Sequence, residues 1–397
     1  MRKISAHYIL TGSGVLLKKG IVTLTDQGVI ADITDTKGEL NEIAGLEFFS
    51  GMITPGFVNA HCHLELSHLY DLFPEKKGLP AFLKSVNELR NSDPAHITDQ
   101  ARKGDAELWQ NGVVAVGDVS NTNKTFALKV QSKIAYHTFV EALGFSPGKA
   151  EKAFSMASDA FNEARDMGLP VSIVPHSPYS ISRELFDKIF TFSAAKDTIL
   201  SMHNQECSAE DDLYLSGTGE IYHHLTQNLG LDLSAFRPSG CSALESVIGW
   251  LPTENNLLLV HNIRTRQKDI DLIGQARSLT KTWFVICPRS NLFIEDRLPD
   301  IELFRKNNLQ ICIGTDGLSS NKKLSVLEEM KTIQTHFPDI PFPEIVTWAT
   351  RNGAEALSMN KWAGTIEIGK RPGLNLITGM DLQHLRLQPQ SKVKRLI

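Results

Sequence analysis

The chain has 397 residues, of which 42% are hydrophobic and 22% are charged, and its formal net charge is −4 at pH 7. This composition is typical of globular proteins, and the length allows two or three domains or one large α/β barrel with an accessory domain. No stretch approaches the roughly 18 uninterrupted apolar residues of a membrane helix, and the N-terminal segment lacks the apolar core of a signal peptide. The absence of a long basic run argues against charge-driven binding of nucleic acid.

Cysteine usage points to a reducing compartment. The cysteines are far apart and none belongs to a CxxC pair; they are Cys62, Cys207, Cys241, Cys287 and Cys312. An odd, scattered set argues against a disulfide scaffold and against a zinc ribbon. We therefore expect a cytoplasmic protein of enzyme size that binds a small molecule, with neither nucleic acid nor a membrane as its partner.

The two ends of the chain share strand character. The N-terminal segments ISAHYIL, GVLLKKGIVTLT and GVIADITD carry β-branched residues with glycine at their breaks, which is typical of short strands. Strand character returns after about Leu357 in GTIEIGKRPGLNLITG. We expect residues 1–52 and 357–397 to form one small β-domain beside the domain of residues 53–356.

Between these ends, short apolar runs alternate with segments of helical periodicity, and each run ends in a polar or ionisable residue. The runs are 52–63, 113–120, 134–142, 171–177, 199–206, 257–262, 283–291 and 310–317, and the helical segments include 80–90, 151–167 and 324–336. Continuous apolar runs are typical of strands buried on both faces, and their alternation with helices implies right-handed parallel crossovers. The pattern predicts an α/β fold, a (β/α)8 barrel, in which chemistry lies at the C-terminal ends of the strands.

The first of these runs ends in His61-Cys62-His63. Alternate side chains of an extended strand share a face, so the two imidazoles can point the same way. Two imidazoles at this spacing can form half of a divalent-metal site. The alternative is a chance His-x-His in an ordinary strand, but the long apolar run and the Pro-Gly turn before it favour a metal site.

Three further strand ends carry ionisable side chains. His203 and Glu206 end the fifth run, His261 ends the sixth, and Asp316 lies in GTDG at the end of the eighth. Each has an ordinary structural explanation when taken singly, as a core histidine, a loop glutamate or a helix-capping aspartate. Together they reach the same face of one fold. The set predicts a catalytic metal site with a free position for water and with Glu206 as a proton carrier.

These motifs resemble those of the metal-dependent amidohydrolase superfamily, most closely its deaminase and chlorohydrolase branch. TPGFVNAHCHLE, VPHSPYS and HNQE resemble that branch's first-, fourth- and fifth-strand motifs, and LVHN, CPRSN and GTDG resemble its sixth-, seventh- and eighth-strand motifs. GTIEIGKRPGLNLI resembles the family's return into a small β-sandwich. The resemblance covers nearly the whole chain and implies a hydrolase that acts on C–N bonds other than peptide bonds.

The resemblance also implies roles for individual residues. The implied metal ligands are His61, His63, His203 and Asp316. Glu206 would shuttle protons, Asp316 would also accept the proton of the attacking water, and His261 would orient or polarise that water. Binuclear relatives usually carry a bridging modified lysine on the fourth strand, and Pro175-His176-Ser177 offers none. One divalent ion is therefore expected; zinc fits best, and some relatives use iron.

A more local resemblance concerns the substrate. HLELSH resembles the corresponding segment of bacterial aminofutalosine deaminases. It implies hydrolytic deamination of an adenine-type nucleoside, namely aminofutalosine, adenosylhomocysteine or adenosine, with release of ammonia. Glu65 shares the strand-face parity of His63 if the strand continues, which makes it a candidate contact to a ribose or a ring nitrogen. The alternative is a salt bridge in a loop.

Other residues near the strand ends are further candidates. His176 is expected to line the pocket because its strand end faces the barrel axis. Arg289 is a candidate bidentate partner for a substrate carboxylate, and the alternative is an ion pair with Glu295 or Asp296. The second and third strands end in acidic residues that fit either support of the metal ligands or helix capping, Asp118 and Glu141.

Two rival functions stand beside deamination. A hydrolase of a cyclic amide or of a halogenated triazine uses the same chemistry on another leaving group, and ammonia release separates it from a deaminase. A non-catalytic scaffold of the same fold typically loses metal ligands, whereas every expected ligand is present here. Relatives are often homodimers, and this sequence alone shows no interface.

Overall fold

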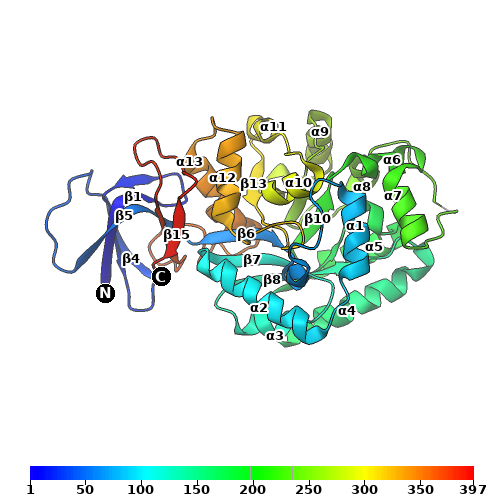
Figure 1. Ribbon diagram of the computed structural model, residues 1–397, viewed down its shortest axis with the longest axis horizontal. Coiled ribbons are helices and arrows are strands. Elements are labelled where there is room, and N and C mark those ends of the chain that lie inside the picture. The colour runs from blue at the N-terminus through cyan, green and yellow to red at the C-terminus, as the bar shows by residue number, and fades with distance from the viewer. Residues whose placement is uncertain (197, 235) are drawn as a thin grey trace.

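Strands from both ends of the chain lie in one sheet at one end of the protein, and the rest of the chain forms a larger α/β part, as the computed structural model shows (Figure 1). The structure describes residues 1–196, 198–234 and 236–397. Within these residues no helix combines the length and the apolar character that a membrane crossing needs.

The sheet of the chain ends has seven strands in the order β15-β14-β5-β1-β3-β4, with β2 on β1. The strands are β1 (Arg2–Leu10), β2 (Leu16–Lys18), β3 (Ile21–Leu24), β4 (Ile30–Thr34), β5 (Leu46–Pro55), β14 (Leu374–Thr378) and β15 (Lys392–Arg395). β5 joins the two ends because it pairs with β1 on one side and with β14 on the other. The strand pairing gives a single sheet, so the β-sandwich expected from the family resemblance is not confirmed.

The larger part contains two four-stranded parallel sheets, β6-β7-β8-β9 and β10-β11-β12-β13. Their strands are β6 (Phe57–Cys62), β7 (Val113–Ser120), β8 (Ala135–Ala142), β9 (Val171–Pro175), β10 (Leu200–Asn204), β11 (Leu257–His261), β12 (Thr282–Ile286) and β13 (Gln310–Ile313). They follow one another in the order that the apolar runs predicted. The expected barrel is not closed by strand pairing, because its eight strands pair as two separate four-stranded sheets.

Backbone hydrogen bonds nevertheless bridge both seams between the halves. The amide of His203, on β10, donates to the carbonyl of His176, just after β9, at 2.9 Å. At the other seam the amides of Thr315 and Asp316, after β13, both donate to the carbonyl of His61 on β6 at 3.1 Å. These bonds lie at the C-terminal ends of the strands, so they fix the relative positions of the residues that were predicted to meet there.

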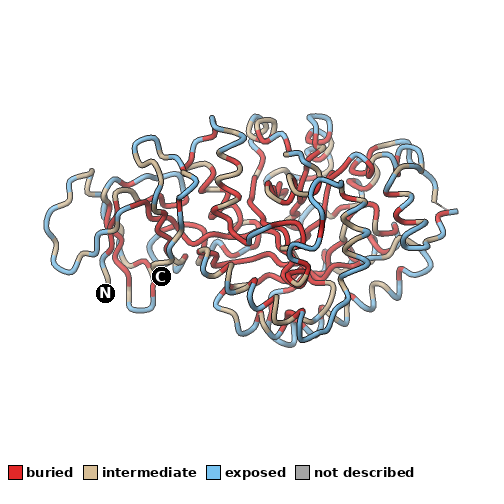
Figure 2. The backbone as a smooth tube through the Cα atoms, viewed as in Figure 1, coloured by how far each residue is buried: buried red, intermediate tan, exposed pale blue. Residues whose placement is uncertain are grey.

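The helices cover the outside of these sheets, and the strands are buried between them (Figure 2). The helices are α1 (Leu79–Leu89), α2 (Pro94–Gln110), α3 (Phe126–Gln131), α4 (Ala150–Asp166), α5 (Arg183–Lys196), α6 (Ser208–Ser216), α7 (Gly219–His223), α8 (Ala243–Val247), α9 (Gln267–Ala276), α10 (Pro288–Glu295), α11 (Ile301–Lys306), α12 (Val326–His336), α13 (Phe342–Thr347) and α14 (Gly353–Ala356). Valine, isoleucine and leucine fill both faces of the strands, which is why these strands read as continuous apolar runs.

The first predicted run divides at Gly56. Residues before it belong to β5 in the sheet of the chain ends, and residues after it form β6. A Cβ atom on Gly56 would lie 2.3 Å from a methyl carbon of Val114 and 2.7 Å from the carbonyl oxygen of Pro372, so only glycine fits this crossing point. β5 thus continues past residue 52, and the proposed division of the chain into two domains stays a prediction.

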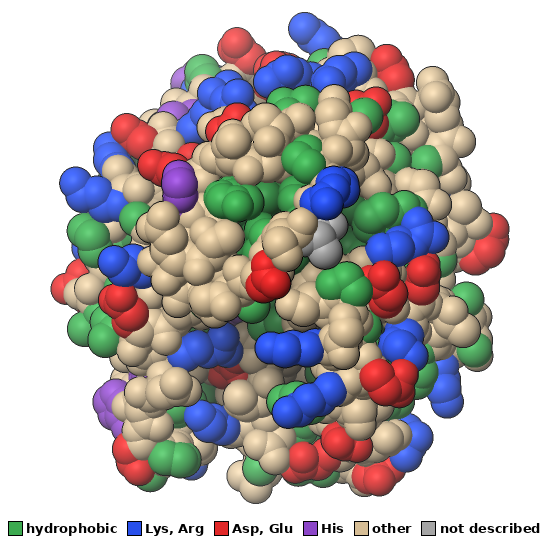
Figure 3. Space-filling model, turned by 90° about the vertical axis from the view of Figure 1, so that its right-hand side faces the viewer, with side chains coloured by type: hydrophobic (Ala, Val, Ile, Leu, Met, Phe, Trp, Pro, Cys, Tyr) green, Lys and Arg blue, Asp and Glu red, His purple; other side chains and the backbone are tan. Residues whose placement is uncertain are grey.

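The outer surface carries charges of both signs. On the face drawn in Figure 3, Lys and Arg side chains are interspersed with Asp and Glu side chains, so neither sign dominates that face. This distribution agrees with the small formal net charge of −4.

A buried ion pair supports the strand that carries the first two histidines. Lys129 Nζ, on α3, lies 2.6 Å from Asp118 Oδ2 on β7, and both side chains are fully buried. Asp118 Oδ1 accepts a hydrogen bond from the amide of Leu64 at 2.8 Å, directly after His63. The pair therefore ties the end of β6 to β7.

We expect Lys129→Met to lower the free energy of unfolding by about 3–5 kcal/mol, because it leaves the Asp118 carboxylate buried without its partner. Urea denaturation followed by circular dichroism measures the loss. Lys152→Met is the matched control, because Lys152 is exposed on α4, and its effect should stay within about 0.5 kcal/mol. Equal stability of the two variants would contradict this role of the pair.

Candidate metal centre

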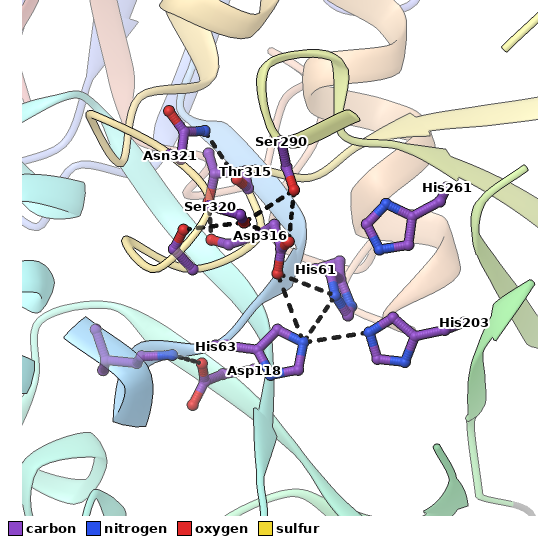
Figure 4. Close-up of polar contacts among 12 residues, drawn as sticks. His61, His63, Asp118, His203, His261, Ser290, Thr315, Asp316, Ser320 and Asn321 are labelled. Carbon is purple, nitrogen blue, oxygen red and sulfur yellow. Dashed lines mark hydrogen bonds and ion pairs between the residues drawn. The ribbon is translucent and has the colours of Figure 1, made fainter. Parts of the chain in front are cut away.

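Three histidine rings and one carboxylate converge at the C-terminal ends of the strands (Figure 4). His63 Nε2 lies 3.1 Å from His61 Nε2 and 3.3 Å from His203 Nε2. Asp316 Oδ1 lies 3.6 Å from His63 Nε2 and 3.8 Å from His61 Nε2. Nitrogen ligands on a tetrahedral zinc, with bonds of about 2.0–2.1 Å, lie about 3.3 Å apart. His61, His63 and Asp316 therefore lie close enough to share one divalent ion, and His203 adjoins this group through His63.

The tautomer of His203 suits metal binding. Its Nδ1 lies 2.9 Å from the carbonyl oxygen of His176, which can only accept, so Nδ1 carries the proton. Nε2 then keeps its lone pair and faces the other ligand atoms. A histidine that binds metal usually donates its second ring N–H in this way, which fixes both the tautomer and the ring orientation.

Asp316 is oriented through its other oxygen. Oδ2 accepts hydrogen bonds from the hydroxyls of Ser290 at 2.6 Å and Ser320 at 2.7 Å, and Oδ1 is thereby left facing the histidines. Gly314 allows this approach, because a Cβ atom there would lie 2.9 Å from both His61 Cβ and Cys287 Sγ. The strand end that carries the aspartate can therefore pack directly against the strand that carries His61.

The backbone is strained at three of these strand ends. Gln205, His261 and Asp316 have φ values of 49°, 75° and 57°, in the left-handed region that non-glycine residues rarely adopt. Such residues cost of order 1–3 kcal/mol each and cluster at functional sites. Part of the backbone strain of the described residues thus lies where the predicted ligands and the proton carrier leave their strands.

Burial sets the protonation state of the site. It lowers the pKa of His61, His63 and His261, which favours neutral imidazoles, the form that binds a metal ion. Burial alone would raise the pKa of Asp316, but the neighbouring imidazoles and the Ser290 hydroxyl bring that pKa below its usual range. Asp316 is therefore ionised and able to act as a ligand.

Glu206 is a buried carboxyl group next to the histidines. Burial raises its pKa to about 8, so it is largely protonated at neutral pH. Its Oε2 lies 3.6 Å from His261 Nε2. Glu210, one turn further along α6, accepts hydrogen bonds from the amides of Glu206 and Cys207 at 2.7 Å and 3.2 Å. Glu206 is therefore a carboxylic acid held at the start of a helix, with a proton to give.

His261 is fixed by a side chain of α10, the helix that follows the neighbouring strand. Its Nδ1 lies 2.8 Å from Asn291 Oδ1, which accepts its proton and leaves Nε2 with a lone pair. Nε2 faces Glu206, and the ring of His261 stacks on that of His203 at 5.4 Å between centroids. His261 can thus accept a proton or orient a water molecule beside the other imidazoles.

A cavity of about 310 Å³ opens onto these residues. His63, His203, His261, Asp316, Glu206 and His176 all contribute to its wall. Apolar residues form much of the remaining wall; they are Leu66, Leu79, Phe82, Leu83, Val86, Leu143, Phe145, Leu225, Leu229 and Leu231. A mostly apolar pocket with a few converging polar groups is typical of small-molecule sites.

Glu65 does not lie on this cavity, and its proposed contact with the substrate is corrected. β6 ends at Cys62 and a short 3₁₀ helix begins at Leu64, so the side-chain alternation of a strand no longer applies to Glu65. Its carboxylate accepts hydrogen bonds from the amides of Asn121 and Thr122 at 3.0 Å and 3.2 Å. Glu65 holds the segment after β7, and its Oε1 lies 3.7 Å from Arg90 Nη2, so the salt bridge named as its alternative is present.

Arg289 is also corrected. α10 begins at Pro288, and this turn directs Arg289 away from the histidines into a separate surface cavity. Its Nε donates to Asn321 Oδ1 at 3.0 Å, and its amide donates to Glu329 Oε2 at 2.9 Å. Its acidic neighbour is Glu329, rather than either of the acidic residues considered from the sequence.

The two acidic residues left undecided by the sequence have different environments. Asp118 pairs with Lys129 and accepts a hydrogen bond from the amide that follows His63, so it holds the end of β6 in place. Glu141 lines the cavity, and its Oε1 lies 3.5 Å from His203 Nδ1. Sequence reasoning missed Ser290, Asn291 and Glu210, although Ser290 and Asn291 belong to the CPRSN motif that it singled out.

The chain is similar to known proteins over most of its length. Residues 52–395 match the model of the amidohydrolase family. An adenosine deaminase of Helicobacter pylori is 26% identical over 379 residues, which cover 93% of this chain and 87% of the relative. The crystal structure of Helicobacter pylori aminofutalosine deaminase in complex with methylthio-coformycin has a TM-score of 0.82 at 22% identity and covers both chains completely. An adenosine deaminase from Xanthomonas campestris with bound zinc has a TM-score of 0.72 at 22% identity, covering 98% of this chain and 86% of its own.

We expect His203→Ala to weaken the binding of Zn²⁺, used as the probe ion, by more than about 100-fold, because it removes one of the converging nitrogens. Equilibrium dialysis followed by elemental analysis measures the affinity. His96→Ala is the matched control, since His96 is exposed on α2, and it should bind zinc like the unsubstituted protein. Unchanged zinc affinity in His203→Ala would show that the ion binds elsewhere.

Proposed function

The chain belongs to the amidohydrolase family, and we propose that it is a metal-dependent deaminase that hydrolyses an adenine-type nucleoside and releases ammonia. Family membership confirms the resemblance drawn from the strand-end motifs. The observation that carries the proposal is the meeting of the three histidines and Asp316 beside a cavity that also contains protonated Glu206.

The ligand set of the proposed metal is His61, His63, His203 and Asp316. Three imidazole nitrogens and one carboxylate oxygen are a donor set that would suit zinc. A bound divalent ion would supply Lewis acidity and lower the pKa of a water molecule towards neutrality. The use of zinc rather than iron, and of one ion rather than two, stays a prediction.

The side chains of the site account for the proton transfers. Asp316 accepts the proton of the attacking water, and His261 orients that water through its free Nε2. Glu206 donates its proton to a ring nitrogen, which makes the adjacent carbon more electrophilic while the water oxygen adds to it. The amino group then takes the proton held by Asp316, the C–N bond breaks and ammonia leaves. The remaining hydroxyl proton returns to Glu206, and a carbonyl forms on the ring.

Two observations support an adenine-type nucleoside as the substrate. The cavity of about 310 Å³ has the size of a small-ligand site, and its apolar residues suit a flat heterocycle and an apolar extension of the sugar. The relative and the neighbouring structures described above are named as deaminases of adenosine and aminofutalosine. His176 is a proposed substrate contact because it lines the cavity beside His203.

Ammonia release tests the proposal directly. We expect zinc-loaded protein to release ammonia from at least one of adenosine, adenosylhomocysteine and aminofutalosine, and not from guanine or cytosine. Asp316→Asn should abolish the release, because it removes the group that accepts the proton of water. Turnover of a cyclic amide or a chlorinated triazine in place of these nucleosides would overturn the proposal and favour the rival hydrolase. No activity on either class, with metal bound, would favour the non-catalytic scaffold.

Glu206 predicts a pH dependence of defined sign. Because the acid must be protonated, kcat/KM should fall as the pH rises above about 8, the raised pKa of this carboxyl. Glu206→Gln should lower kcat by about 10²–10⁴-fold and remove this limb of the pH profile. Glu210→Gln is the matched control, since burial also raises the pKa of Glu210 to about 8. If the limb were lost in Glu210→Gln but kept in Glu206→Gln, the assignment of the proton donor to Glu206 would be wrong.

A further inference from the structure

Glu141 is a carboxylate in the wall of the cavity that the catalytic steps do not use. It lies near the end of β8, and its side chain is almost completely buried. Its Oε2 accepts a hydrogen bond from Asn121 Nδ2 at 2.8 Å. Asn121 is itself held by Glu65 through its amide and by Arg90 through its Oδ1, so the position of Glu141 is well defined.

The second oxygen of Glu141 has no hydrogen-bond donor among the described residues. The nearest candidate is His203 Nδ1 at 3.5 Å, but that N–H is already given to the carbonyl of His176 at 2.9 Å. A carboxylate oxygen in a largely apolar cavity costs free energy unless a donor reaches it. When a ligand displaces water from this part of the cavity, a donor on that ligand is needed to satisfy the oxygen.

Among the described residues that line the cavity, no cationic side chain is paired with Glu141. Arg90 is the one Lys or Arg side chain among the described residues that line the cavity. Its Nη2 donates to Asn121 at 2.7 Å and lies 3.7 Å from Glu65 Oε1, so its charge already faces a carboxylate outside the cavity. A hydrogen-bond donor on the ligand can therefore take the place beside Glu141 that no Lys or Arg side chain of the cavity wall fills.

The geometry points to a ribose hydroxyl of the nucleoside as that donor, and we propose that Glu141 determines specificity for the sugar. This inference rests on the proposed function. An adenine base joined to ribose has only its 6-amino group as a donor, and in the proposed reaction that group lies beside Asp316 and Glu206. Nε2 of His203 faces the metal ligands and Nδ1 faces Glu141, so Glu141 lies at the opposite edge of the same ring. The remaining donors that every one of the candidate nucleosides shares are the 2′- and 3′-hydroxyls.

A cycle of substrates and variants tests this contact. Ammonia release gives kcat/KM for adenosine, 2′-deoxyadenosine and 3′-deoxyadenosine with the unsubstituted protein, Glu141→Gln and Glu141→Ala. We expect the unsubstituted protein to disfavour one of the deoxynucleosides by about 10- to 100-fold, the range for a hydrogen bond to a charged group. Glu141→Ala should lower kcat/KM for adenosine by a similar factor. It should also reduce the preference for adenosine over the deoxynucleoside to less than about threefold, and Glu141→Gln should give intermediate values.

Glu65→Gln is the matched control, because Glu65 holds the same segment after β7 from outside the cavity. It should preserve the ratio between adenosine and the deoxynucleoside, whatever its effect on the absolute rates. A purely structural role of Glu141 would likewise lower all rates equally, so an unchanged ratio in Glu141→Ala would overturn the inference. If circular dichroism shows that Glu141→Ala does not fold, the ratio of kcat/KM between adenosine and the deoxynucleoside in Glu141→Gln decides instead.

Binding of the products gives a second readout that needs no turnover. We expect calorimetry to show that inosine binds the unsubstituted protein more tightly than the matching deoxyinosine, and that Glu141→Ala removes the difference. Activity on adenosine with no preference between ribose and its deoxy forms would overturn only this inference. No activity of the unsubstituted protein on any purine nucleoside would overturn the proposed function, and the inference would fall with it.

Discussion

The meeting of three imidazole rings and one carboxylate at the strand ends is the constraint on which the rest of the structure depends. His61 and His203 lie on strands of different sheets, and Asp316 follows a third strand, so the two halves must keep a fixed register. Backbone bonds at both seams provide it, from the amide of His203 to the carbonyl of His176 and from the amides of Thr315 and Asp316 to the carbonyl of His61. Because a binding site works only within about 0.5 Å of its productive geometry, rigid strand ends suit this task better than loops.

Burying so many polar groups together is costly, and the surroundings offset that cost with specific partners. Ser290 and Ser320 occupy one oxygen of Asp316, Asn291 fixes the tautomer of His261, and Glu210 holds the backbone of Glu206. The same burial produces the chemistry, since it keeps the imidazoles neutral and Glu206 protonated. His203 then separates two functions of the cavity, with proton transfer on its Nε2 side and the proposed sugar contact on its Nδ1 side.

The sequence predicted the strand ends well because the information there is local. Buried parallel strands appear as apolar runs, and a histidine or aspartate at the end of such a run lies at the reactive edge. Glu65 and Arg289 were misplaced because both follow a change of secondary structure. A 3₁₀ helix begins at Leu64 and α10 begins at Pro288, and each turn redirects the side chain. The free oxygen of Glu141 depends on contacts between segments far apart in the chain, which no local pattern encodes.

Anomalous diffraction from crystals of the metal-loaded protein, recorded at the absorption edge of the metal, tests the central claim most directly. The account predicts one peak within ligand distance of Nε2 of His61, His63 and His203 and of Oδ1 of Asp316, with the Nδ1 of His203 still bonded to the carbonyl of His176. A peak between Glu141 and His176, whose ligand atoms also lie close enough to share an ion with His203, would contradict it. Two peaks of equal height would contradict the prediction of a single ion.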